Sequence, residues 1–146
     1  SNIPNPSATK TLLEDYVATG LSLSTHPIEL LHKAKLLPKH TQANQLHLKA
    51  HQTHVSVIGL VIGRQRPGTS KGVTFVTLED NTGNINVVVW LATSRAQKQA
   101  YLKSTILQVK GILERGDGDV IHIIAGKLTD LSHLLAELNT KSRNFH

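Results

Sequence analysis

The sequence contains no cysteine and no methionine, and it has few aromatic residues. Without cysteine the chain can form neither a disulfide framework nor a thiolate zinc site, and it has no cysteine nucleophile. Without methionine, the start at Ser1 is not a natural one as written, and we expect the chain to be a piece of a larger protein. Aromatic residues make up 3% of the chain, which excludes an extended surface for stacking nucleic-acid bases.

Long apolar runs and a secretory leader are also missing. No run approaches the roughly 20 apolar residues that span a bilayer, and the N-terminus lacks a basic segment followed by an apolar core. Hydrophobic residues at 39% and charged residues at 18% describe a globular protein, and 146 residues suit a single domain. We therefore expect a cytoplasmic protein that does not contact membranes.

The chain carries an excess of positive charge. Sixteen Lys and Arg against ten Asp and Glu give a formal net charge of +6. A charge of this size biases a protein toward polyanions such as nucleic acid, although many basic domains bind nothing acidic.

The first third of the sequence predicts helices. Residues 1–9 contain two prolines and little to bury, so we expect a disordered lead or a remnant of cloning. Residues 10–53 are predicted to form a helical lead-in and a linker, with one helix ending at Gly20 and a second ending before Pro38.

From His54 the apolar residues recur with a period of two, which predicts a mainly β domain over 54–130. A helix over 91–102 separates the third strand from the fourth, and 131–146 predict a C-terminal helix and a basic tail. Three strands, a helix and two strands are the chain order of the five-stranded OB-fold barrel. The internal Gly59 and Gly111 fit such a barrel, because its strands bend sharply. The predicted strands are 54–66, 73–80, 85–90, 104–116 and 119–128.

The alternation within the second and third strands places two aromatic residues on the outer face. Asn84 and Asn86 carry amides that are costly to bury, so Trp90, which alternates in step with them, is predicted to face outward. Phe75 shares the outer face with Glu79 for the same reason. Both aromatic side chains are therefore candidates for stacking on unpaired bases, the alternative being that a helix or another domain covers them.

The segment "GRQRPGTSKG", residues 63–72, places positive charge in the loop between the first two strands. It is not a P-loop, because Thr69 stands where the phosphate-binding lysine belongs and the loop leads into a strand. The OB-fold commonly binds oligonucleotides with this loop, so Arg64, Arg66 and Lys71 are candidates for contacts with a sugar-phosphate backbone. Ordinary solvated charge is the alternative.

Further candidates lie on the later strands, and no catalytic or metal set is predicted. Lys110 and Arg115 on the fourth strand, and Lys127 after the fifth, could add phosphate contacts. The spacing of His47, His51 and His54 suits two ligands on a helix, but no carboxylate or thiol completes a metal site. No nucleophile elbow or paired carboxylates are found, so this segment is not expected to be an enzyme or to hold a cofactor.

Several segments resemble one protein family. The segments "VIGLVIGRQRPGTSKGVTFVTLEDNTGNINVVVW", "VKGILERGDGDVIHIIAGKLTDLSHLL" and "KSRNFH" resemble the C-terminal OB-fold region of bacterial error-prone DNA polymerases, which are related to the polymerase III alpha subunit (C-family). "LEDYVATGLSLSTHPIELL" is similar to the segment preceding that domain. The sequence departs from the family pattern at Asn81 and Asn84, and no sliding-clamp peptide is identified.

The resemblance implies a parent enzyme that copies damaged templates during DNA-damage-induced mutagenesis and uses Mg²⁺ in an upstream catalytic domain. This chain would then hold single-stranded template DNA near that domain. Two alternatives remain. The same face could dock another polymerase domain or a mutasome partner, or it could bind RNA as anticodon-binding OB domains do.

Overall fold

The computed structural model describes residues 25–65 and 72–143, with the side chains of 141–143 excepted. The helix predicted to end at Gly20, and the candidate residues Arg66 and Lys71, lie outside the described residues. The helices are α2 (Pro27–Lys33), η1 (Ala43–Leu48), α3 (Leu91–Ala96), α4 (Lys98–Lys103), η2 (Asp117–Asp119) and α5 (His133–Arg143). The strands are β1 (His54–Gln65), β2 (Val73–Asp80), β3 (Gly83–Trp90), β4 (Ile106–Arg115) and β5 (Ile121–Asp130).

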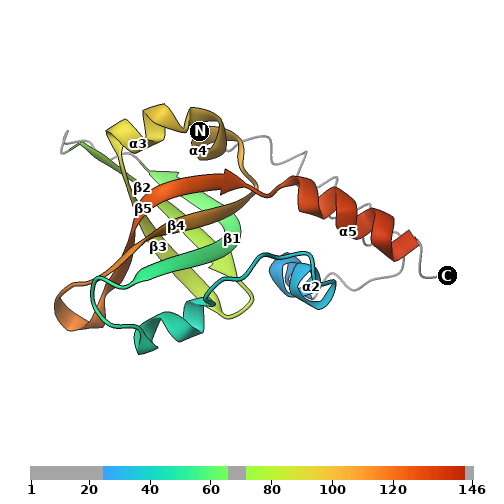
Figure 1. Cartoon of the computed structure of the whole chain (residues 1–146), viewed down its shortest axis with the longest axis horizontal. Coiled ribbons are helices and arrows are strands. Elements are labelled where there is room, and N and C mark those ends of the chain that lie inside the picture. Colours follow the sequence, from blue (N-terminus) through green and yellow to red (C-terminus); the bar gives the residue numbers. More distant parts are fainter. Residues whose placement is uncertain (1–24, 66–71, 144–146) are drawn as a thin grey trace.

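The five strands close into a barrel in the order β1-β2-β3-β5-β4 (Figure 1). All neighbouring strands are antiparallel except β3 and β5, which run parallel and close the barrel. A short turn joins the antiparallel neighbours β2 and β3, whereas α3 and α4 connect β3 to β4. The predicted fold class, an OB-fold barrel with helical structure between the third and fourth strands, is confirmed.

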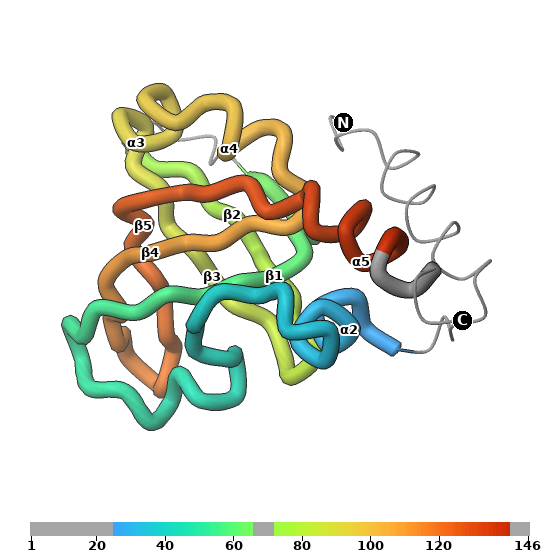
Figure 2. The backbone as a smooth tube through the Cα atoms, turned by 45° about the vertical axis from the view of Figure 1, so that its right-hand side comes forward, coloured from blue at the N-terminus to red at the C-terminus, as the bar shows by residue number. Residues whose placement is uncertain are grey.

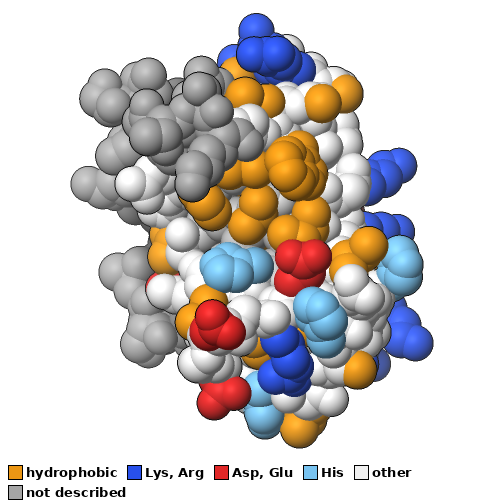
Figure 3. All heavy atoms as spheres, turned by 90° about the vertical axis from the view of Figure 1, so that its left-hand side faces the viewer, with side chains coloured by type: hydrophobic (Ala, Val, Ile, Leu, Met, Phe, Trp, Pro, Cys, Tyr) orange, Lys and Arg blue, Asp and Glu red, His pale blue; other side chains and the backbone are white. Residues whose placement is uncertain are grey.

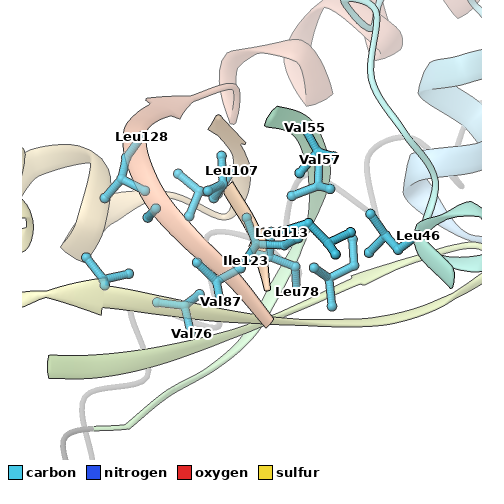
Figure 4. Packing of buried hydrophobic residues seen from close by; sticks show 14 of the residues in the cluster. Leu46, Val55, Val57, Val76, Leu78, Val87, Leu107, Leu113, Ile123 and Leu128 are labelled. Atoms are coloured by element: carbon cyan, nitrogen blue, oxygen red, sulfur yellow. The ribbon is translucent and has the colours of Figure 1, made fainter. Parts of the chain in front are cut away.

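The barrel interior is filled by aliphatic side chains of β-branched and leucine type. These are the alternate residues of each strand, because successive side chains of a strand point to opposite faces. Figure 4 shows the labelled residues of this cluster pointing toward one another between the strands. The labelled residues are Leu46, Val55, Val57, Val76, Leu78, Val87, Leu107, Leu113, Ile123 and Leu128, all buried.

Glycine is required at two positions where strands approach one another closely. A Cβ at Gly111 would lie 2.0 Å from the carbonyl oxygen of Ile124, and a Cβ at Gly59 would lie 2.8 Å from the Cβ of Leu78. The register between β4 and β5 shifts between Lys110 and Gly111, which leaves Gly126 as the extra residue of a β-bulge. Gly111, which borders this bulge, fits the role in strand bending that the sequence predicts, whereas Gly59 allows β1 and β2 to approach closely.

A second apolar cluster lies outside the barrel, where α2 and α5 cover the outer face of β1. Ile58 and Ile106 point away from the barrel interior and are fully buried against Leu31 of α2 and Leu135 of α5. Figures 1 and 2 show α2 and α5 on the same side of the barrel, next to β1. The helices before and after the barrel thus share this second cluster with the barrel, and they cover the middle of the outer β1 face, at Ile58 and Leu60.

The predicted linker contains the short helix η1, which a network around Asp80 holds to the turn between β2 and β3. Asp80 is buried at 2% exposure, and its Oδ2 accepts a hydrogen bond of 2.8 Å from the Ala43 amide. Its Oδ1 accepts hydrogen bonds from the amides of Thr82 and Gly83 and from the Thr82 hydroxyl. The Asn44 amide in turn donates to the Thr82 hydroxyl oxygen at 3.0 Å. The weak periodicity of 38–53 gave no indication of this helix.

The single helix predicted over 91–102 is divided into α3 and α4 at Gln97, whose backbone is not helical. Its side-chain amide donates to the Gly126 carbonyl at 2.9 Å and its Oε1 accepts from the Leu128 amide at 2.7 Å. β3 pairs with β5 at Ile123 and Ile124. Farther along β5, the side chain of Gln97 makes hydrogen bonds that a neighbouring strand would otherwise make. Among the residues described, no helix is long and apolar enough to cross a membrane.

Candidate nucleic-acid interface

The outer face of β2 and β3 exposes two aromatic side chains. Phe75 is 36% exposed and Trp90 is 51% exposed. Phe75 pairs with Val88 across the two strands, and Val73 pairs with Trp90 two residues nearer the start of β2 and the end of β3. Phe75 and Trp90 therefore lie diagonally across the β2–β3 pair, on the same face, as the alternation in the sequence predicts.

Polarity changes along this face from apolar at one end to polar at the other. Beyond Phe75, the outward residues of β2 are Thr77 and Glu79, and those of β3 are Asn86 and Asn84. Seen from the left-hand side of Figure 1, hydrophobic side chains gather in the middle of the surface (Figure 3). Acidic and histidine side chains lie below them, and several Lys and Arg side chains lie along the upper and right-hand edges. Because β2 and β3 contain no histidine, this view includes the surface of other elements as well.

The loop between β1 and β2 begins and ends beside the two aromatic residues. Gln65, the last residue of β1, pairs with Phe75. The carbonyl oxygen of Gly72, which follows the loop, accepts a hydrogen bond of 2.8 Å from the Leu91 amide, directly after Trp90. The chain therefore enters residues 66–71, which include Arg66 and Lys71, next to Phe75 and leaves them next to Trp90. Neither β2 nor β3 contains a lysine or arginine, so cations for this face must come from neighbouring segments.

Arg64 points toward the barrel interior, not toward the two aromatic residues. The register between β1 and β2 shifts between Val61 and Gly63, and after this bulge Arg64 pairs with the buried Val76. Its Nε donates to the Tyr101 carbonyl at 2.7 Å and its Nη2 donates to the Ser104 carbonyl at 2.6 Å. Burial lowers the pKa of Arg64 from its ordinary value by desolvating the guanidinium.

The carbonyl oxygens that Arg64 binds belong to the C-terminal end of α4, where a helix leaves its last carbonyl groups without backbone donors. Arg64 therefore anchors this helix to the barrel. Sequence alternation missed this role because one inserted residue reverses the direction of every later side chain in a strand.

Arg115 is held in a similar way, whereas Lys110 is exposed. Arg115 donates from Nε and Nη2 to the Lys49 carbonyl, at 3.1 and 2.6 Å, and from Nη2 also to the His47 carbonyl. It thereby fastens the segment after η1 to the end of β4. Lys110 lies at the middle of β4 on the outer surface and pairs in register with Ser56 of β1 and Lys127 of β5.

The turn between β4 and β5 is acidic. Asp117 and Asp119 form η2 and are exposed, and Glu114 precedes them on the outer face of β4. Because a phosphate backbone is repelled by such a cluster, this turn does not suit the contact with nucleic acid that the corresponding loop often makes in OB-folds.

The described residues contain no group of three His, Asp or Glu side chains placed to hold a metal ion. Of the three histidines with suggestive spacing, His51 accepts a hydrogen bond of 3.0 Å at Nδ1 from the Arg115 amide, and the His47 carbonyl accepts from the Arg115 side chain. His54 opens β1 and pairs with Ile112. The three residues are therefore placed by β1, β4 and their connections rather than on one helix face.

The closed five-stranded barrel, with aromatic side chains exposed on β2 and β3, has the architecture of an OB-fold domain. Residues 55–131, more than half of the chain, match the family described as "OB-fold nucleic acid binding domain". The chain therefore belongs to this family.

Comparison with individual proteins relates the chain to relatives that share one name. The chain is 62% identical over 144 residues to a protein of Vibrio vulnificus (strain YJ016) and 64% identical over 141 residues to one of Vibrio campbellii. A relative in Saccharophagus degradans is 48% identical over 145 residues. All three are named "Error-prone DNA polymerase", and the matches cover 97 to 99% of this chain. The chain spans 14% of the length of each of these relatives.

Solved structures agree on the fold. Asparaginyl-tRNA synthetase from Pyrococcus horikoshii matches 65% of this chain and 23% of its own chain, with a TM-score of 0.52 and 18% identity. Aspartyl tRNA synthetase from Entamoeba histolytica matches 64% of this chain and 21% of its own, with a TM-score of 0.54 and 14% identity. At these identities the likeness shows the barrel fold alone.

Proposed function

We propose that the chain binds single-stranded DNA as the OB-fold domain of an error-prone DNA polymerase, and that it holds template near a catalytic domain elsewhere in the protein. The observation that carries the proposal is the exposed pair Phe75 and Trp90 on the β2–β3 face of an OB-fold barrel, beside the basic loop between β1 and β2. The relatives, named as error-prone DNA polymerases and matched along almost the whole of this chain, supply DNA as the nucleic acid.

The face suits unpaired bases better than a duplex. An exposed aromatic side chain can stack on any base, and each such contact contributes about 1–3 kcal/mol. The groups that read base edges in a duplex are carried by a helix or ribbon that enters the major groove, whereas Phe75 and Trp90 lie on the surface of a sheet. We therefore infer binding with little dependence on base sequence.

The phosphate contacts of this face are assigned to the loop. Lys71 lies four residues before Phe75 in the sequence, and Arg66 opens the same loop directly after Gln65, the partner of Phe75. If two to four phosphates are contacted in all, the logarithm of the binding constant falls with the logarithm of salt concentration with a slope of about −1.5 to −3. An affinity that does not change from low to moderate salt would exclude these contacts.

Trp90 provides a direct assay, because it is the only tryptophan in the chain. Adding an oligonucleotide of thymidines should quench its fluorescence if a base stacks on it. Phe75→Ala should weaken binding by roughly 5- to 150-fold, which corresponds to about 1–3 kcal/mol for the loss of one stacked base. Leu48→Ala is the matched control, since Leu48 is 73% exposed but lies on η1. Equal effects of the two substitutions, or no quenching at micromolar protein, would refute the proposal.

A protein-interaction function is the second candidate, and one observation favours it. An outward apolar row crosses four strands through the paired residues Phe75, Val88, Ile124 and Ile112. Such a row could dock another domain of the polymerase or a mutasome protein, with Trp90 as an anchor. This candidate predicts that Trp90→Ala weakens association with the remainder of the polymerase and leaves DNA affinity unchanged. Preference for a ribose strand over a deoxyribose strand of the same sequence would favour the RNA-binding alternative.

The activity of the whole protein is part of the same proposal. The chain corresponds to 14% of its relatives, and we infer that DNA-directed DNA synthesis, its Mg²⁺ ions and its role in damage-induced mutagenesis belong to the remainder. The domain itself would contribute to the binding of template and not to the chemical step.

A further inference from the structure

A pair of lysines faces outward on β4 and β5, away from the β2–β3 face. Lys110 and Lys127 are direct partners in the register of the two strands, and both are exposed. Direct partners in an antiparallel pair have Cβ atoms about 4.5–5.5 Å apart, and like charges at that position destabilise the sheet. No ion pair to either lysine occurs among the described residues. The positive charge is therefore concentrated and not neutralised within the described part of the chain.

A third lysine, Lys98, follows a residue that is hydrogen-bonded to β5 beside Lys127. Gln97 binds the Gly126 carbonyl and the Leu128 amide, the groups on either side of Lys127. Lys98 follows Gln97 at the start of α4 and is exposed. The charge at this end of β5 thus comes from three separate elements.

An open groove adjoins the lysine pair. Its floor is formed where Gly111, Ala125 and Gly126 offer little or no side chain, and Lys110 lies at its edge. His54, Ser56, Ile112 and Ile124 also line the groove, and none of its lining residues is acidic.

The lysine pair lies on the outer surface that continues from the aromatic face. Val88 of β3 is the partner of Ile124 of β5, and Ile124 is the partner of Ile112 of β4, two residues from Lys110. The chain that follows Trp90 reaches β5 beside Lys127, where Gln97 binds the Gly126 carbonyl and the Leu128 amide. The other end of β4 and β5 leads to the acidic turn of Asp117 and Asp119.

We propose that Lys110 and Lys127 form a second phosphate-binding site, across which a DNA strand continues from Trp90 over the end of β5. This inference rests on the proposed function and adds the path of the strand. The acidic turn between β4 and β5 repels the phosphate backbone, and the lysine pair attracts it. The strand therefore leaves the aromatic face toward the lysines and not toward that turn, which the OB-fold commonly uses.

The test compares two double variants of the whole chain that remove the same charge. Lys110→Gln with Lys127→Gln removes the proposed site, and Lys35→Gln with Lys39→Gln removes two exposed lysines after α2. Binding of a fluorescent thymidine oligonucleotide of about 12 nucleotides is measured by anisotropy between about 50 and 200 mM salt. Removing two phosphate contacts should reduce the magnitude of the log–log salt slope by about 1.4, since each contact on a single strand contributes about 0.7. At 0.1 M salt this corresponds to about 25-fold weaker binding.

Two further measurements on the lysine variant complete the test. An oligonucleotide of about 4 nucleotides, which the aromatic face alone can hold, should bind the lysine variant as well as the unchanged chain. The melting temperature of the lysine variant should be unchanged or higher, because the substitution removes repulsion between like charges.

Equal salt slopes for the two double variants would overturn the inference, and the proposed function would stand if Phe75→Ala still weakened binding. Failure of the unchanged chain to bind any oligonucleotide would overturn both.

Discussion

Replacing Arg64 should lower the free energy of unfolding of the chain without removing a phosphate contact. The guanidinium donates to the carbonyls of Tyr101 and Ser104 at 2.7 and 2.6 Å, and the bulge in β1 turns it toward the barrel interior. Arg64→Ala leaves both carbonyls without these donors at the end of α4. The prediction is therefore a loss of stability with little change in DNA affinity.

The magnitude follows from the two hydrogen bonds. Hydrogen bonds to a charged group contribute about 1.5–3 kcal/mol each, and the partly exposed position of Arg64 lets water replace part of this. We expect a total loss of about 2–4 kcal/mol in the free energy of unfolding. For a chain of this size, each kcal/mol lowers the melting temperature by about 3 °C, so the expected decrease is about 6–12 °C.

Two variants separate geometry from charge. Arg64→Lys keeps the charge but replaces a planar fork by a single ammonium group, so it should recover only part of the stability. Arg95→Ala removes an exposed arginine of α3 and should change the melting temperature by less than about 2 °C. Melting is followed by circular dichroism, and DNA affinity is measured well below the transition. A melting temperature within about 2 °C of the unchanged chain, together with weaker DNA binding that Arg64→Lys restores, would refute the reasoning.

Two further substitutions test how the barrel is held together. Gly111→Ala should cost about 3 kcal/mol or more or prevent folding, because its Cβ would lie 2.0 Å from the Ile124 carbonyl oxygen, whereas Gly63→Ala, with open space around it, should be tolerated. Similar thermal melts for these two variants would contradict the close approach of β4 and β5. Asp80→Ala should destabilise the chain by about 2–4 kcal/mol and speed amide hydrogen exchange in η1, because Asp80 accepts bonds from both η1 and the following turn. Asn81→Ala, at the exposed neighbouring position, should leave the exchange of η1 unchanged.

The barrel strands and the direction of most of their side chains follow from the sequence alone. A buried strand with one exposed face must alternate, and Val76, Leu78, Ile85, Val87 and Val89 do so without interruption. The strand β2 was predicted with its observed bounds, and the exposure of Phe75 and Trp90 follows from the same alternation. The local sequence pattern is sufficient here because each side chain's direction depends on its own residue type and on its immediate neighbours in the strand.

Three features depend on contacts between distant residues, and the sequence pattern did not reveal them. The burial of Ile58 outside the barrel requires α2 and α5, which are separated from it by many residues. Asp80 suits a turn by its chemistry, but its bond to Ala43 joins it to a segment predicted as linker. The direction of Arg64 depends on one extra residue in β1, which alternation within the strand does not reveal because the bulge is defined by the pairing with β2.

The distribution of cations is more informative than their number. Arg64 and Arg115 each donate to backbone carbonyls, a role that suits a rigid fork of donors, and so part of the net charge serves to hold helices and connections to the barrel. The paired cations exposed on the sheet are lysines, Lys110 and Lys127, and we propose that they bind phosphate as flexible point charges without reading base edges. A domain with stacking aromatic residues and lysine phosphate contacts gains affinity from features that every nucleotide shares. Under the proposed function, such a domain would hold a template strand whatever its base sequence.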